Sequence, residues 1–83
     1  MENSFTVKIF SLSKGLEIVD SIRLIRIKSK DYNLLLMPGY VSILGEIEGN
    51  IEFELDSNSI KYDNIVAYYI NSNDVFSLLL REI

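Results

Sequence analysis

The chain has 83 residues, the size of one ordinary domain, and 48% of them are hydrophobic while 24% are charged. This composition excludes a disordered chain and supplies one hydrophobic core, so we expect a single domain over residues 1–83. The net charge of −4 disfavours nucleic acid as a partner, and the absence of cysteine and histidine removes disulfides, the commonest general base and most zinc ligands.

Short strands separated by turns are predicted along the first half of the chain. Phe5, Val7 and Ile9 alternate with polar residues, which is the period of a half-buried strand. A shift in apolar phase between Leu24 and Ile25 predicts a β-bulge within a long third strand. The expected strands cover 5–10, 16–19, 21–28 and 34–37, and the last of them ends at the strong turn signal Pro38-Gly39.

The second half continues the same pattern. Ile51, Phe53 and Leu55 alternate with glutamates, which predicts a strand with one wet face. Turns are expected at 48–50, 56–59 and 71–74, between strands at 40–47, 51–55, 60–62, 65–70 and 75–80. The last segment has a competing interpretation, because Asn73 or Asp74 could cap a terminal helix. The whole pattern predicts an all-β sandwich or barrel.

Catalytic and ligand-binding motifs are not supported by this sequence. Ser11-Leu12-Ser13-Lys14 has the Ser-x-x-Lys spacing of penicillin-recognising enzymes without their other elements, so we interpret it as a turn. Asp56-Ser57-Asn58 starts like a calcium loop but has no central glycine or late glutamate in register. The glycines form no phosphate loop. We therefore expect no catalytic residue, cofactor or metal.

Clusters of like charge are interpreted mainly as solvated strand faces. The acidic cluster contains Glu46, Glu48, Glu52 and Glu54. A small enzyme that uses Glu46 and Glu48 as acid and base is one hypothesis for this cluster. The basic stretch contains Arg23, Arg26, Lys28 and Lys30, which could meet an acidic partner. The polar N-terminus and the lack of a run of about 20 apolar residues predict a cytoplasmic protein that is not inserted in a membrane.

Three segments are apolar in both strand phases, namely 34–37, 65–70 and 78–80. Each sheet of a sandwich has one inner face, so some of these side chains are expected to point outward. A contiguous outward apolar patch marks a protein interface. The sequence therefore favours a protein that works by packing against other proteins.

The order of segments resembles the N-terminal domain of the epsilon subunit of F-type ATP synthases, the delta subunit of mitochondria. Met37-Pro38-Gly39-Tyr40 is similar to the family's Leu-Pro-Gly-His motif, with tyrosine in place of histidine. Gly49-Asn50-Ile51-Glu52-Phe53 is similar to its Gly-x-Ile-x-Ile hairpin, and the segment from Asn73 to Leu79 to its closing Asn-x-Val-x-x-Leu strand. The likeness covers essentially the whole chain, although family glycines are replaced at Tyr32 and Leu35 and near Ala67.

The resemblance implies a two-layer antiparallel β-sandwich of about ten short strands, fixed to a gamma-like coiled coil in a rotating central stalk beside alpha and beta ATPase subunits. Carried over by position, Tyr40, Val41 and Ser42 would lie towards gamma, and Asp31, Tyr32 and Asn33 would face a membrane ring or another partner.

The helical hairpin that follows this domain in typical members is expected to be absent after Ile83, together with the inhibition of ATP hydrolysis that it can exert. A rotary motor adapted to motility is a variant of this hypothesis. The alternative is a stand-alone interaction module unrelated to ATPases.

Overall fold

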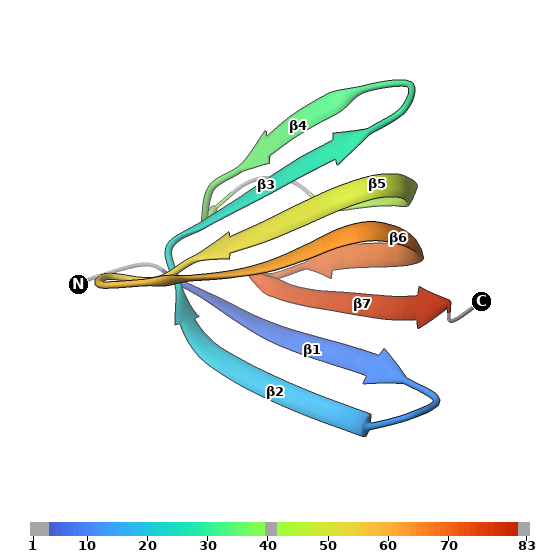
Figure 1. Ribbon diagram of the computed structural model, residues 1–83. Coiled ribbons are helices and arrows are strands. Elements are labelled where there is room, and N and C mark those ends of the chain that lie inside the picture. Colours follow the sequence, from blue (N-terminus) through green and yellow to red (C-terminus); the bar gives the residue numbers. More distant parts are fainter. Residues whose placement is uncertain (1–3, 40–41, 82–83) are drawn as a thin grey trace.

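A computed structural model describes residues 4–39 and 42–81, and this part of the chain is built of seven strands without a helix (Figure 1). The prediction of an all-β fold is confirmed. The strands are β1 (Phe5–Ser11), β2 (Gly15–Ile22), β3 (Leu24–Ser29), β4 (Asn33–Leu36), β5 (Ile43–Glu54), β6 (Ser59–Ser72) and β7 (Val75–Arg81). The described part of the chain contains no helix with the length and apolar character that a membrane crossing requires.

The seven strands form one continuous sheet in the order β2-β1-β7-β6-β5-β3-β4. Neighbouring strands are antiparallel, except that β1 pairs with β7 in parallel. The expectation of a wholly antiparallel arrangement is therefore wrong for this pair. β1 and β7 are not joined by a hairpin, so no tight turn imposes the antiparallel direction on them.

The sheet bends because β5 and β6 are long and change direction midway (Figure 1). Between the pairs Gly49↔Ile65 and Ile51↔Tyr62, β5 advances by two residues and β6 by three, which is a β-bulge in β6. Asn64 has a positive φ of 54° there, and its backbone N–H donates to Oδ1 of Asn50 at 2.9 Å. This corner divides the sheet into two half-sheets.

The first half-sheet consists of β2, β1 and β7 with residues 66–72 of β6 and 43–48 of β5, and the second consists of β4 and β3 with residues 50–54 of β5 and 59–62 of β6. In Figure 1, β1 and β2 lie at the bottom and β3 and β4 at the top. The two half-sheets enclose a common core, and this arrangement is consistent with the predicted sandwich.

All seven strands contribute apolar side chains to the core. The ring of Phe53 from the second half-sheet meets that of Phe76 from the first edge-to-face, with centroids 5.9 Å apart. Burying each such side chain contributes about 1.5–3 kcal/mol, so this cluster supplies most of the stability of a chain without disulfides. The buried apolar residues are Phe5, Val7, Ile9, Ile22, Ile25, Ile27, Leu36, Ile47, Ile51, Phe53, Ala67, Tyr69, Phe76 and Leu78.

Several predicted boundaries are wrong. The described residues form seven strands where about ten were expected, because β5 runs through the predicted turn at 48–50 and the predicted strands at 60–62 and 65–70 are both parts of β6. The predicted bulge at Leu24 is instead a break at Arg23, and a register shift with a positive φ lies at Ser21. Both features occur where the local sequence suits either a turn or a bend.

The hairpin between β6 and β7 is tighter than predicted. Asn71 and Ser72 belong to β6, and Asn73 and Asp74 alone form the turn, both with positive φ. Two successive positive φ values characterise the type I′ turn, which suits the twist of a two-residue hairpin. Val75–Arg81 is a strand, so the alternative of a terminal helix is wrong.

Candidate protein interface

The outer surface of the first half-sheet is apolar, and we call it the apolar face. The side chains alternate along each strand, so those that do not enter the core point outward. The exposed fraction of these residues ranges from 39% for Phe10 to 75% for Leu44. The apolar face consists of Phe10, Leu16, Ile18, Leu44, Tyr68, Ile70 and Leu79.

The register of the sheet shows that these residues are contiguous. Leu16 pairs with Phe10, Phe10 with Leu79, and Leu79 with Tyr68, which makes one row across β2, β1, β7 and β6. The next row contains Ile18, Lys8, Ser77, Ile70 and Leu44, and it extends to β5. A contiguous apolar surface of this kind is typical of a protein interface.

A hollow lies in the middle of the apolar face. Its volume is about 370 Å³, and Ser77 lies among Phe10, Tyr68, Ile70 and Leu79. The paired positions place Ser77 between Lys8 on β1 and Ile70 on β6. The small side chain of Ser77 leaves the space that its larger neighbours surround.

The sequence signal for this surface was incomplete. The doubly apolar runs at 65–70 and 78–80 contribute Tyr68, Ile70 and Leu79. The run at 34–37 also exposes apolar side chains as predicted, Leu35 on β4 and Met37 just after it, but these lie in the other half-sheet. Four members alternate with other residues in an ordinary strand pattern and were missed. The register of β1, β2 and β5 would have been needed to find Phe10, Leu16, Ile18 and Leu44.

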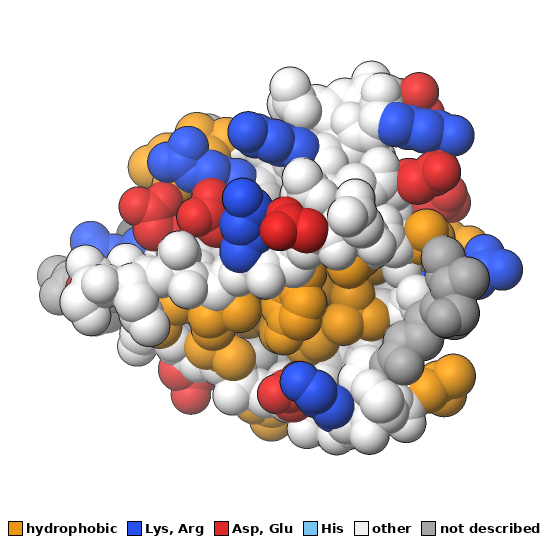
Figure 2. All heavy atoms as spheres, in the orientation of Figure 1, with side chains coloured by type: hydrophobic (Ala, Val, Ile, Leu, Met, Phe, Trp, Pro, Cys, Tyr) orange, Lys and Arg blue, Asp and Glu red, His pale blue; other side chains and the backbone are white. Residues whose placement is uncertain are grey.

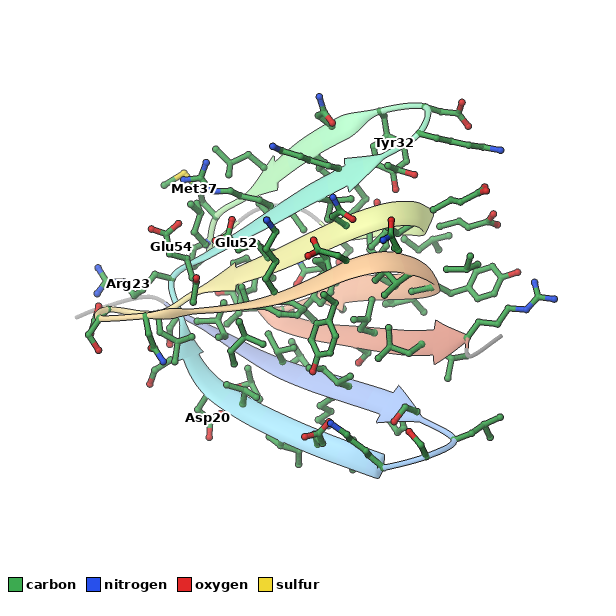
Figure 3. All side chains as sticks on the ribbon, viewed as in Figure 1. Asp20, Arg23, Tyr32, Met37, Glu52 and Glu54 are labelled. Atoms are coloured by element: carbon green, nitrogen blue, oxygen red, sulfur yellow. The ribbon has the colours of Figure 1, made fainter. Side chains whose placement is uncertain are left out.

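The outer surface of the second half-sheet is mainly charged, although Leu35 is exposed on it at the edge strand β4, and we call it the charged face. Arg26, Glu52 and Lys61 follow one another in register across β3, β5 and β6. Arg26 also forms an ion pair with Glu54, with the Arg26 nitrogen 3.3 Å from the Glu54 oxygen. Figure 2 shows Lys, Arg, Asp and Glu side chains mixed over β3 and β5, and Figure 3 shows Glu54 between Glu52 and Arg23. Opposite charges that alternate in this way keep a sheet face wet.

The residues predicted to face gamma are only partly placed. Tyr40 and Val41 lie outside the described residues, and Ser42 is exposed immediately before β5. The preceding turn is anchored, because the backbone N–H of Gly39 donates to Oδ1 of Asp74 at 2.8 Å. The carbonyl oxygen of Asp74 in turn accepts from the backbone N–H of Thr6 at 3.0 Å.

The residues predicted to face a ring lie at the connection between β3 and β4. Asp31 and Asn33 are exposed, while Tyr32 is half-buried at the opposite end of β3 from Arg23 (Figure 3). The hydroxyl of Tyr32 donates to the backbone carbonyl of Glu46 at 2.6 Å. Asp31 and Tyr32 line a hollow of about 340 Å³ together with Leu44, so this connection adjoins one end of the apolar face.

The buried side chain of Tyr69 links the connection between β3 and β4 to the core. Its hydroxyl lies 3.1 Å from that of Tyr32, which already donates to a carbonyl, so Tyr69 is the donor of this pair. Burial, followed by this hydrogen bond, raises the pKa of Tyr69 above the usual tyrosine range. Gly45 makes room for the ring, because a Cβ at Gly45 would lie 2.6 Å from the Tyr69 hydroxyl.

The carboxylates of the enzyme hypothesis line the same 340 Å³ hollow. Glu48 forms an ion pair with Lys30 at 3.0 Å, and this contact raises the pKa of Lys30. Lys30 is therefore paired with Glu48, one of the two carboxylates that the enzyme hypothesis requires. Among residues 4–39 and 42–81, no three potential metal ligands come together.

Comparison with known proteins gives a structural likeness and no sequence match. No family model and no curated protein matches the chain. A chain in the cryo-EM structure of the Tetrahymena thermophila mitochondrial ATP synthase central stalk and c-ring is similar, with a TM-score of 0.73 over 98% of this chain. The fold of this chain therefore occurs in that central stalk and c-ring structure. The identity is 12%, and the chain spans 66% of the Tetrahymena chain, so the likeness establishes the fold alone.

Proposed function

We propose that the chain is a non-catalytic subunit of a central stalk, equivalent to the epsilon sandwich domain, in an F-type ATP synthase or a related rotary motor. The observation that carries this proposal is the contiguous apolar face on a fold found in such an assembly. A surface of this kind is unfavourable in water and is stabilised when a partner covers it. A motor that drives motility instead of ATP synthesis is compatible with the same surface.

The apolar face is proposed to clamp a gamma-like coiled coil. It spans five neighbouring strands, which corresponds to about 19 Å at the usual spacing. A standard interface takes about 800 Å² from each partner, which a sheet face of this width can supply. All strands belong to one continuous sheet around one core, which suits a rotor subunit because the transmission of torque needs a rigid body instead of reactive groups.

Two other contacts complete the proposal. Ser42, with Tyr40 and Val41, is proposed to lie towards gamma, and the connection containing Asp31, Tyr32 and Asn33 towards a membrane ring or a neighbouring subunit. The hollow at Tyr32 adjoins Leu44, so a partner on the apolar face also reaches this connection. Alpha and beta ATPase subunits would belong to the same complex, which would be cytoplasmic and peripheral to the membrane.

The test is a mass-spectrometric inventory of the native complex purified through a tag on this chain. The proposal predicts a gamma-like coiled-coil protein together with alpha-like and beta-like ATPase subunits. It also predicts that Ile70→Lys on the apolar face releases them, whereas Lys61→Glu on the charged face retains them. A partner set that contains no ATPase subunit contradicts the proposal and favours a stand-alone interaction module.

A further inference from the structure

The hollow on the apolar face distinguishes one kind of partner from others. Phe10, Tyr68, Ile70 and Leu79 surround Ser77, which is half-buried, so the space is open to a side chain arriving from outside. Anchors of protein interfaces are typically large side chains that fill such pockets near the centre of the contact. The hollow therefore requires a convex partner with one side chain projecting above its surroundings.

A second copy of the chain, packed with the centres of the two apolar faces opposed, does not meet this requirement. That arrangement would place hollow against hollow and enclose an empty space. The cost of an empty apolar cavity grows with its volume, because the atoms that line it lose their contacts. An α-helix presents a narrow convex ridge whose side chains at i and i+4 are about 6 Å apart. The two rows of the apolar face are separated by about 6.7 Å along each strand, and a helix lying across the strands would place its ridge over the space between these rows.

Two charged residues lie within the two rows of the apolar face and would act on the orientation of a partner, whereas Glu48 and Arg81 lie one row further along the strands. Lys8 lies beside Ser77 in one row, and Glu46 is paired with Tyr68 at the end of the other row. β1 and β5 are three strand spacings apart, or about 14 Å, which corresponds to about ten residues of helix. Complementary charges on a partner fix its orientation and exclude others.

We propose that the hollow at Ser77 is a socket for one large apolar side chain, carried by an amphipathic helix with an acidic residue facing Lys8 and a basic residue facing Glu46. The identity of this helix as the gamma-like coiled coil rests on the proposed function. The socket and the polarity rest on the geometry of the apolar face alone.

The experiment titrates the isotope-labelled full chain with synthetic helical peptides of about 21 residues and follows its amide signals by NMR. One peptide carries a central leucine with flanking acidic and basic residues, a second has alanine in place of that leucine, and a third has the two charges exchanged. We expect shifts centred on Ile70, Ser77 and Leu79, with binding at least about tenfold weaker for the second peptide and weaker for the third.

Two matched variants distinguish binding in the hollow at Ser77 from nonspecific binding to an apolar surface. Ser77→Leu fills the hollow while making the face more apolar, and it should lose at least about tenfold in affinity for the first peptide. Ser72→Leu adds the same side chain at an exposed position of β6 outside the hollow and should bind as the wild type does. Thermal unfolding checks that both variants fold. Equal binding by the two variants, shifts elsewhere, or self-association through Ser77 overturns the socket.

The same variants in the native complex keep this inference apart from the proposed function. If Ser77→Leu retains the gamma-like coiled coil as well as the wild type does, the socket is wrong and the stalk proposal stands. If the wild type binds the leucine peptide through Ser77 but purifies without any ATPase subunit, the stalk proposal is wrong and the socket stands.

Discussion

The apolar face and the charged face are built from the same two long strands, yet their chemistry is opposite. β5 presents Leu44 on the apolar face and Glu52 on the charged face, and β6 presents Ile70 on one and Lys61 on the other. The corner at Gly49 and Asn64 makes this separation, because it bends each strand into both half-sheets. This difference is the basis of the proposal that one side of the chain faces water and the other a partner.

The largest expected effect on stability comes from removing the aromatic contact that packs the two half-sheets together. Phe76 is fully buried and meets both Phe53 and Tyr69. Phe76→Ala should lower the free energy of unfolding by about 3–5 kcal/mol, because it removes a large apolar ring and leaves a cavity. Leu79→Ala on the same strand but on the apolar face should cost less than about 1 kcal/mol. Urea unfolding measures both, and equal losses would contradict this account of the core.

The next effect concerns the corner itself. A Cβ at Gly49 would lie 2.2 Å from the backbone oxygen of Lys28, so Gly49→Ala must push β3 and β5 apart. We expect a loss of about 1–3 kcal/mol or more in urea unfolding. Gly15→Ala is the control, because no atom lies within 4 Å of its Cβ position and its positive φ costs about 1 kcal/mol. A milder effect at Gly49 than at Gly15 would show that the corner is not tight.

The two faces should differ sharply in partner binding. Ile70→Lys places a charge in the middle of the apolar face, and we expect at least a tenfold loss of affinity for the native partner, or about 1.4 kcal/mol. Lys61→Glu on the same strand should change affinity less than twofold. Both variants should unfold near the wild-type temperature, because both positions are exposed. Loss of binding in Lys61→Glu with retention in Ile70→Lys would reverse the assignment of the faces.

A smaller effect depends on pH. The pKa of Tyr69 is raised in the folded state, so the folded chain holds this proton more tightly than the unfolded chain. Its contribution to stability is complete below about pH 10 and is lost as the pH rises above that value, by at most about 1.4 kcal/mol per unit. Urea unfolding at pH 8 and pH 11 should show a smaller alkaline loss for Tyr69→Phe than for the wild type. An identical loss would exclude Tyr69 as a source of this dependence.

The smallest effect should come from the ion pairs of the charged face. Arg26 and Glu54 are both about half exposed and 3.3 Å apart. Exposed pairs of this kind contribute about 0.2–1 kcal/mol, and salt screens them. Arg26→Ala should therefore change the unfolding midpoint only slightly, and the difference should shrink at 1 M salt. A loss above 2 kcal/mol would mean that the charged face is structural.

The sequence predicted the elements better than the way they bend. The alternation around Ile51 and Phe53 correctly places both side chains in the core. The glycine at position 49 suited a turn as well as a corner, because local chemistry does not say whether the next strand pairs backwards or continues. The apolar face was foreseen at Ile70 and Leu79, where both strand phases are apolar, and missed at Leu44, where the register decides.

The most direct test is hydroxyl-radical footprinting of the isolated chain and of the same chain within its native complex. We predict strong protection of the apolar face on assembly, above all at Leu44, Ile70 and Leu79, with Tyr62 and Met37 outside that face unchanged. Equal labelling of the apolar face in the two samples would contradict the claim that a partner covers it.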